Sequence, residues 1–223
     1  MAALAPPGTP RNERRARTIS RLLDATIDSL IEVGYQATTV RGVARRAGVS
    51  QGATTHHFPR RRDLISAALD EIANRVVGHQ RAQVPLLPRE PEARRGAAID
   101  LLRSGFSGPL FIAWVRLWIA AAEDDELRDI MRPVERRLWE MARLLARDTL
   151  PELAEDEVFD TRLAVIYSML RGLGMQQHFD PRRDERRRDP WPAYRASIVL
   201  LLHAEPEQFV LGPRRRRGER AAN

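Results

Sequence analysis

The sequence predicts an all-α protein of about nine helices, in which a small N-terminal three-helix unit precedes a larger helical domain. Apolar residues recur at helical spacing through most of the chain, and no segment shows the alternation of a β-strand. Gly and Pro residues end the periodic segments. With 223 residues, of which 43% are hydrophobic, the chain is long enough to bury a substantial core.

Composition excludes several classes of protein. No stretch approaches the roughly 18 consecutive apolar residues that a membrane-spanning helix needs, and the N-terminus has no apolar signal segment. We therefore expect a cytoplasmic protein with no membrane partner. The chain has no cysteine, which excludes disulfides, thiolate metal sites and a cysteine nucleophile.

Charge is distributed unevenly along the chain. Residues 1–84 hold 13 Arg against 7 acidic residues, a balance of +6. Residues 85–212 hold 19 against 22, and residues 213–223 hold 5 against 1. The excess of positive charge in the N-terminal third predicts a polyanionic partner for that part.

Four helices are expected in the first third of the chain. The first, residues 13–33, carries an apolar stripe that includes Ile19, Leu22 and Ile27, and Gly34 supplies a left-handed stop. The other three are expected over residues 38–47, 50–58 and 60–84.

Capping residues define the middle two of these helices. Either Thr38 or Thr39 can cap the second helix, and Gly48 lies at its terminator position. Ser50 can cap the third helix, which ends near Phe58. This gives a helix, a tight glycine turn and a second short helix.

Five longer helices are expected downstream. Pro133 falls inside one of them and would cost about 3 kcal/mol in a regular helix interior, so we expect a kink or a break there. Asp189 and Pro190 form a plausible cap and first turn for the last helix. The five helices are expected over residues 91–105, 108–122, 126–148, 157–178 and 190–205.

The segments divide the chain into five parts. Both ends are expected to be disordered, because the N-terminal arm is rich in Ala, Pro and Gly and the tail is charged without periodicity. The Arg run 214–217 is either a nonspecific DNA-binding tail or a solubilising one. The parts are an arm (1–11), a unit of three helices (12–59), a connecting helix (60–84), a larger helical domain (85–206) and a basic tail (207–223).

The segment "AGVSQGATTHHF", residues 47–58, is typical of the turn and second helix of a helix-turn-helix, in which the second helix lies in the DNA major groove. When Val49, Ala53 and Phe58 pack against the first helix, the remaining polar residues point outward. Small hydroxyl residues and Gly allow close approach to phosphates, and Gln can bridge adenine N6 and N7. The outward residues are Gln51, Gly52, Thr55 and His56.

The run "TTVRGVARRAGVSQGATTHHFPRRRDL", residues 38–64, resembles the DNA-binding domain of tetracycline-repressor-like (TetR family) regulators. The Ala-Gly-Val-Ser turn, the following Gly52 and the His-Phe pair carry the resemblance. Thr55 departs from the family, since an aromatic residue is common there. The resemblance implies that Thr38 or Thr39, Arg41 and Arg61 lie near phosphates, and that Ser50, Gln51, Thr55 and His56 lie on the recognition helix.

Other interpretations of this region carry less support. His56 and His57 point about 100° apart on a helix and lack further ligands, so we expect no metal and no cofactor; His57 is expected to pack inside and His56 to face DNA. The triplet 60–62 is either a solvated face or a phosphate contact. No catalytic motif is present, and Asp124 and Asp125 are expected in an exposed turn.

The resemblance also implies an effector cavity among the later helices. Three Trp residues on two adjacent helices favour an apolar or aromatic effector, although an aromatic and Met stripe is also typical of a core. Arg116 could pair with one of three partners: an anionic ligand, an acidic neighbouring residue or water. The candidate effector residues are Phe111, Trp114, Arg116, Trp118, Met131, Trp139, Tyr167 and Met175.

The last two helices predict a homodimer. Residues 198–202 are apolar on every side, and Gly172 and Gly174 let another helix come close. A two-fold dimer through a four-helix bundle satisfies both features, and burial within a large monomer is the alternative. The candidate interface residues are Tyr167, Leu170, Gly172, Gly174, Ile198, Leu201 and Leu202.

Together these features predict a homodimeric transcriptional regulator, a repressor released from a palindromic DNA operator by a small effector that acts through the helix 60–84. A nonspecific, nucleoid-type DNA-binding protein and an all-α enzyme are the alternatives.

Overall fold

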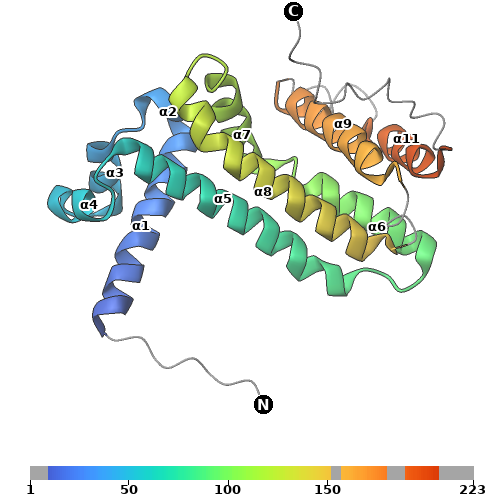
Figure 1. Ribbon diagram of the computed structural model, residues 1–223, viewed down its shortest axis with the longest axis horizontal. Helices are drawn as coiled ribbons and strands as arrows, with labels where there is room; N and C mark the ends of the chain where they lie inside the picture. Colours follow the sequence, from blue (N-terminus) through green and yellow to red (C-terminus); the bar gives the residue numbers. More distant parts are fainter. Residues whose placement is uncertain (1–9, 152–156, 180–188, 206–223) are drawn as a thin grey trace, which may run out of the picture. The chain divides into compact units, whose positions relative to one another are not determined.

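The computed structural model describes residues 10–151, 157–179 and 189–205. The regular elements in these ranges are ten α-helices and one 3-10 turn (Figure 1). No helix in these ranges is long and apolar enough to cross a membrane. The elements are α1 (Pro10–Glu32), α2 (Gly34–Ala37), α3 (Val40–Ala47), α4 (Gln51–His57), α5 (Arg61–Gln83), η1 (Val84–Leu86), α6 (Pro91–Ser104), α7 (Gly108–Ala120), α8 (Asp125–Thr149), α9 (Phe159–Phe179) and α11 (Trp191–His203).

The nine expected helices are all present, with ends that differ by a few residues. The sequence missed α2, a single turn too short to show periodicity, which starts at Gly34 with φ 79°. Of the kink or break expected at Pro133, the break is wrong, because α8 runs through this residue. Pro133 is exposed, so water can satisfy the carbonyl that loses its intrahelical hydrogen bond. The arm expected over residues 1–11 is too long, because α1 begins at Pro10. The rest of the arm, the loop 180–188 and the tail 207–223 lie outside the described residues.

Two compact units make up the chain. The first contains residues 1–87 and 101–142, and the second contains residues 88–100 and 143–223. Helix α7 and most of α8 therefore belong with the N-terminal helices, whereas the sequence suggested a boundary near residue 85. The reason is a core that these segments share.

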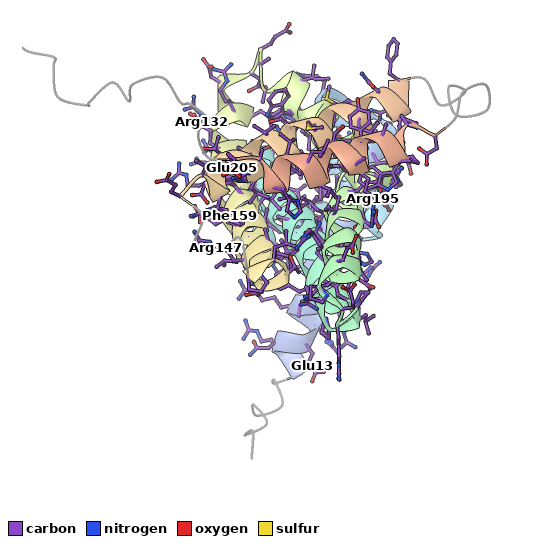
Figure 2. All side chains as sticks on the ribbon, turned by 90° about the vertical axis from the view of Figure 1, so that its right-hand side faces the viewer. Glu13, Arg132, Arg147, Phe159, Arg195 and Glu205 are labelled. Carbon is purple, nitrogen blue, oxygen red and sulfur yellow. The ribbon has the colours of Figure 1, made fainter. Side chains whose placement is uncertain are left out.

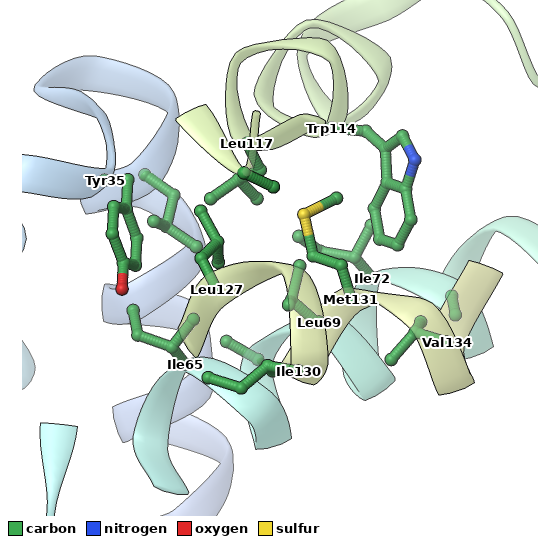
Figure 3. Packing of buried hydrophobic residues seen from close by; sticks show 14 of the residues in the cluster. Tyr35, Ile65, Leu69, Ile72, Trp114, Leu117, Leu127, Ile130, Met131 and Val134 are labelled. Carbon is green, nitrogen blue, oxygen red and sulfur yellow. The ribbon is translucent and has the colours of Figure 1, made fainter. Parts of the chain in front are cut away.

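The larger core of the first unit joins the C-terminal end of α1 to α2, α5, α7 and α8 (Figure 3). Ile27 and Leu30 of α1 and Tyr35 of α2 belong to the same buried cluster as Leu117 of α7 and Leu127 of α8. Full burial of one such aliphatic side chain is worth about 1.5–3 kcal/mol. The larger core therefore holds α7 and α8 against the end of α1.

A smaller core holds the two short helices α3 and α4 against α1 and the start of α5. Leu22 and Ala25 of α1 are buried with Val43 of α3, Phe58 at the end of α4 and Leu64 of α5. Helix α1 thus contributes to both cores of the first unit. We refer to α1–α4 and the start of α5 as the head.

The second unit contains most of α6, the end of α8, α9 and α11. Arg162 of α9 is buried and donates a hydrogen bond from Nη1 to the Leu201 carbonyl at 2.7 Å. Figure 2 labels Arg147, whose guanidinium lies 5.4 Å from the centre of the Phe159 ring. The Asp189 carboxylate accepts from the Trp191 amide at 3.0 Å, which confirms the expected cap of α11.

We expect two glycine substitutions to change stability in opposite directions. Gly48 has φ 60°, a left-handed conformation that costs a side-chain-bearing residue about 1–2 kcal/mol, so Gly48→Ala should lower the free energy of unfolding by about that amount. Gly78 lies within α5 with nothing within 4 Å of an added Cβ. Gly78→Ala should raise the free energy of unfolding by about 0.5–1 kcal/mol.

Urea unfolding followed by circular dichroism measures both effects. A Gly48→Ala variant at least as stable as the wild type would contradict the left-handed turn at Gly48, and a less stable Gly78→Ala variant would contradict the open helical site at Gly78.

Candidate functional site

Helix α4 is short, and its two ends fix it to the head. The Ser50 side chain caps it by accepting from the Ala53 amide at 3.2 Å, and Phe58 at its C-terminal end is buried in the smaller core. Thr54, on the inner side, is fully buried and donates to the Ser50 carbonyl at 3.0 Å. This hydrogen bond explains how a Thr can occupy a core position.

The outer side of α4 is exposed, as the sequence predicts. Gln51, Gly52, Thr55 and His56 are all solvent-exposed. No atom lies within 4 Å of a Cβ added at Gly52, so a duplex could approach the helix closely there. The Thr55 hydroxyl donates to the Gln51 carbonyl at 3.0 Å. The Gln51 amide and the His56 ring therefore offer the longer polar side chains of this surface.

Two capping hydroxyls lie at the N-terminal ends of α3 and α4. The Thr39 Oγ1 accepts from the Gly42 amide at 3.1 Å, just as Ser50 does at α4. A capping hydroxyl uses its oxygen as acceptor, so its proton can still be donated to a phosphate. Arg41, in the first turn of α3, is exposed. Thr39, Arg41 and Ser50 therefore offer donors suited to phosphate oxygens.

Thr38 does not belong to this surface, which corrects one alternative from the sequence. Only 1% of Thr38 is exposed. Its hydroxyl lies 3.0 Å from the Ser29 hydroxyl and donates to the Gly34 carbonyl at 2.8 Å. Thr38 therefore ties α2 to α1, and Thr39 is the capping residue.

Arg61 is also used inside the protein. Its Nε donates to the Thr38 carbonyl at 2.9 Å, its Nη2 donates to the Tyr35 carbonyl, and its guanidinium lies 4.0 Å from the centre of the Tyr35 ring. Burial raises the pKa of Tyr35, so the ring stays neutral beneath the cation. This arrangement corrects the expected role of Arg61, because the side chain joins α5 to α2 instead of projecting toward a phosphate.

The two neighbouring arginines have different surroundings. Arg62 pairs with Glu126 of α8 at 3.5 Å, and Arg60 is exposed at the N-terminal end of α5. The Arg60 amide donates to the Asp63 carboxylate at 3.1 Å, which caps α5. Arg60 and Arg62 are both exposed, and Arg62 is the one with an acidic partner on α8.

The adjacent histidines differ in environment. His56 is exposed and His57 is half-buried, and their rings lie edge to face with centres 5.3 Å apart. Burial lowers the pKa of His57, and the charges of His56 and Arg15 lower it further. Within the described residues, no group of three His, Cys, Asp or Glu residues could hold a metal ion.

Helix α1 borders the same surface. Arg21 donates from Nη2 to the carbonyl oxygens of Ala47 and Gly48, at 2.5 and 3.3 Å, where α3 turns into α4. Arg15, farther toward the N-terminus, lies close enough to His57 for its charge to affect that ring. The arginine-bearing part of α1 therefore runs beside the turn and the recognition helix.

Comparison with known proteins identifies this head. The sequence model of "Bacterial regulatory proteins, tetR family" matches residues 22–68, which run from the middle of α1 into α5. A curated HTH-type transcriptional regulator of Mycobacterium tuberculosis is 30% identical over 167 residues, which cover 73% of this chain and 83% of the relative. The chain belongs to the tetR family.

Other relatives of this tetR-family chain agree with the assignment. The HTH-type transcriptional regulator CymR of Pseudomonas putida is 29% identical over 195 residues, covering 83% of this chain and 93% of CymR. Regulator SCO7518 from Streptomyces coelicolor A3(2) superposes with a TM-score of 0.64 at 19% identity, covering 84% of this chain and 99% of SCO7518.

A third comparison involves a solved structure with a bound ligand. The multidrug binding protein EbrR, solved with imidazole, has a TM-score of 0.61 at 25% identity, covering 85% of this chain and 97% of EbrR. The curated relatives named above are transcriptional regulators, and this chain is a DNA-binding transcriptional regulator rather than an enzyme.

In this tetR-family protein, a groove of about 490 Å³ lies between α7 and α8 of the first unit. Trp118, 49% exposed, and Met131 line it, and both were among the expected effector residues. The sequence did not indicate the remaining lining residues, which are Ile119, Ala121, Ala122, Arg128, Arg132 and Glu135. Glu135 follows Met131 by four residues, so helical spacing from Met131 was the signal that could have found it.

The other expected effector residues lie elsewhere. Trp114 is buried in the larger core and donates to the Glu135 carboxylate at 2.8 Å, and Phe111 is buried edge to face with Phe106. Arg116 is corrected, because it donates to the Ile31 carbonyl at 2.6 Å and thereby joins α7 to α1. Trp139 is half-buried on α8, outside the lining of the groove, while Tyr167 and Met175 are half-buried on α9 in the second unit.

The expected dimer residues divide into two groups. Leu170, Gly174, Ile198 and Leu202 are buried within their own protomer, so they cannot form a surface for a second copy. Gly172 is exposed, with nothing within 4 Å of an added Cβ. Tyr167 and Leu201 are half-buried. The exposed apolar residues of α9 and α11 that the sequence missed include Val165 and Leu200, which is 72% exposed.

Proposed function

We propose that this regulator is a homodimer that represses transcription from a palindromic operator and is released by a small apolar or aromatic effector. The observation that carries the proposal is the exposed polar side of α4, held outward by a buried inner side. A helix of this kind fits the major groove of DNA. Two copies related by a two-fold axis read the two halves of a palindrome.

The residues of the head suggest a division between base and phosphate contacts. Gln51 is exposed on α4 and has the amide pair that matches an adenine edge. Thr39, Arg41 and Ser50 lie at the starts of α3 and α4, where hydroxyl, guanidinium and backbone donors suit phosphates. The base contact selects the sequence, while the phosphate contacts supply affinity that falls steeply with salt.

Support for the dimer comes from the outer surface of α9 and α11. Val165, Ser168 and Gly172 follow one another on α9 at intervals of three or four residues and are all exposed. The exposed residues Ala196 and Leu200 repeat the spacing on α11. Small side chains flanked by apolar ones allow two helices of a second copy to pack closely, as in a four-helix bundle.

The groove between α7 and α8 supplies the effector site of this proposal. Its lining is mainly apolar around Trp118, Ile119 and Met131, with Glu135 as an acceptor. A volume of about 490 Å³ fits a small aromatic molecule. EbrR, a multidrug binding protein whose structure was solved with imidazole, gives a related example.

The same groove adjoins the larger core, which suggests how an effector reaches the head. Ala121 and Met131 line the groove and also belong to the cluster that contains Leu30 and Tyr35. Arg116 of α7 holds the end of α1 through the Ile31 carbonyl. In this proposal the signal passes from α7 to α1 and α2, in addition to the route through α5 that the sequence suggested.

A nucleoid-type protein without an effector is the second candidate, favoured only by the basic charge of the head. Sequence selection from random DNA distinguishes the two, because a nonspecific protein enriches no half-site. An enriched palindrome also gives the spacing between the heads.

The division of DNA contacts predicts different effects for two variants. Gln51→Ala should remove about 1–3 kcal/mol of discrimination at one base pair of each half-site. Arg41→Ala should weaken binding to all sequences and reduce the slope of log K against log salt by about 0.9 for each phosphate that is no longer neutralised. Fluorescence anisotropy on the selected operator and its single-base variants measures both, and an equal, uniform weakening in the two variants would contradict the division.

The proposed dimer surface predicts an effect of charge at Gly172. Gly172→Glu should convert the dimer to a monomer, because a carboxylate would be buried without a partner between two copies. Gly78→Glu is the matched control, since both glycines are exposed in helices with open space around the Cβ. Sedimentation velocity at micromolar concentration reads the result, and a dimeric Gly172→Glu variant would exclude this surface.

The groove predicts that Trp118 contributes to ligand affinity. Trp118→Ala should weaken binding of the aromatic dye anilinonaphthalene sulfonate about tenfold, the equivalent of about 1.4 kcal/mol. Leu86→Ala, at another exposed apolar residue, should leave the affinity unchanged. Equal affinities of the two variants in a fluorescence titration would remove the groove as the effector site.

A further inference from the structure

The N-terminal part of α1 extends beyond the cores of the head. Residues 11–17 are all exposed, and the first buried residue of the helix is Leu22. Figure 1 shows this end of α1 projecting past the other helices of the head. Arg, Ala and Glu are strong helix formers, so this segment can stay helical without burial. Figure 2 labels Glu13 near this end of α1. Residues 11–17 therefore form a short, basic and exposed helical segment.

Arginine dominates this segment. Arg11, Arg14, Arg15 and Arg17 lie within two turns, against the single acidic residue Glu13. The structure records no ion pair for Arg11 or Arg15 within the described part of the chain. The next acidic residue, Asp24, pairs with Arg75 of α5. Asp24 is therefore engaged with Arg75 and does not neutralise the arginines of residues 11–17.

Arg11 and Arg15 lie on one side of α1. Arg11 and Arg15 precede Ile19 at steps of four residues, so they continue the side of α1 on which Ile19 packs against the smaller core. That core contains Val43 of α3 and Phe58 at the end of α4. The side of α1 that carries Arg11 and Arg15 therefore extends the side that faces the helix-turn-helix.

One contact ties this part of α1 to the DNA-facing surface. Arg21 donates hydrogen bonds to the carbonyls of Ala47 and Gly48 at the turn before α4. Arg15 lies six residues earlier on the same helix, and its charge is among the causes that lower the pKa of His57 at the end of α4. Because the outer side of α4 faces the proposed major groove, the arginines beside it lie within the field of the same duplex.

We propose that Arg11 and Arg15 of α1 form a second DNA contact, which binds backbone phosphates that flank the segment read by α4. The inference rests on the proposed function, since it requires the head to dock on DNA through α4. A duplex carries about one negative charge per 1.7 Å of its axis, and a row of unneutralised guanidinium groups beside it gains affinity by releasing counterions. The contact lengthens the operator that each protomer covers.

The test uses the full-length protein and the operator that it selects from random DNA. Two duplexes are compared, one limited to the selected site and one with about 10 flanking base pairs, roughly one helical turn, at each end. On the longer duplex, Arg11→Ala/Arg15→Ala should lower the slope of log K against log salt by about 0.9 per neutralised phosphate, or about 3.6 for the four arginines of a dimer. On the shorter duplex the variant should bind as the wild type does.

The matched control removes the same charge elsewhere. Arg89 and Arg136 are exposed, outside the head, and the double change to Ala should leave the slope on both duplexes unchanged. Arg11→Lys/Arg15→Lys should keep the wild-type slope, because the slope depends on the number of phosphates neutralised by Lys or Arg and not on the shape of the cation. Hydroxyl-radical footprinting should show flanking protection that is absent only from the Ala variant.

The outcomes separate this inference from the proposed function. If the wild type selects no sequence, the proposed function fails, and the flanking contact fails with it. If the wild type selects an operator but the Ala variant matches the Arg89 and Arg136 control on the longer duplex, the flanking contact is overturned and the proposed function stands. A slope in the Lys variant as low as that of the Ala variant would overturn the assignment to phosphates.

Discussion

The first unit depends on α1 burying two different parts of its length in two different cores. Leu22 and Ala25 pack with α3, α4 and α5, whereas Ile27 and Leu30 pack with α2, α5, α7 and α8. A helix with continuous backbone hydrogen bonds resists bending between these two parts. A shift of the larger core must therefore be passed to the smaller one, and α4 follows, because Phe58 belongs to the smaller core.

The polar contacts around α2 strengthen this connection. Arg61 holds the carbonyls of Tyr35 and Thr38, and Arg116 holds that of Ile31. A hydrogen bond that involves a charged group is worth about 1.5–3 kcal/mol, and allosteric coupling between two sites is typically about 1–3 kcal/mol. In the proposed switch, breaking or forming one such hydrogen bond is large enough to account for release from DNA.

The sequence predicted the fold because its signals are local. Thr39, Gly48 and Ser50 act on amides and carbonyls within a few residues, so their roles as caps could be inferred from spacing alone. Thr38 and Thr39 carry the same hydroxyl, and only the contact with Ser29, nine residues away, places Thr38 inside. The short α2 also depends on contacts that are distant in the sequence. Its single turn shows no periodicity, and Tyr35 holds it in a core built from distant helices.

Long side chains and repeated residue types limited the prediction of the site. Trp114 and Trp118 are one turn apart on α7, yet Trp114 is buried with Glu135 as its partner while Trp118 lines the groove. Local pattern cannot separate them, because the position of α8 decides which ring is covered. Arg61 and Arg116 resembled ligand-binding cations in the sequence, and their reach to carbonyls of other segments depends on the tertiary fold.

The outer surface of α9 and α11 is a second feature that the sequence pattern alone could not predict. Residues 198–202 are apolar on every side of the helix, which indicated two buried faces. The pattern could not show which of the two faces packs inside the protomer. Ile198 and Leu202 are buried, and Leu200, two residues from each, is exposed. Residues two apart on a helix point about 200° apart, so the protomer itself assigns Leu200 to the opposite face. In a two-fold dimer each contact made by this face occurs twice, so small and apolar residues there contribute at double weight.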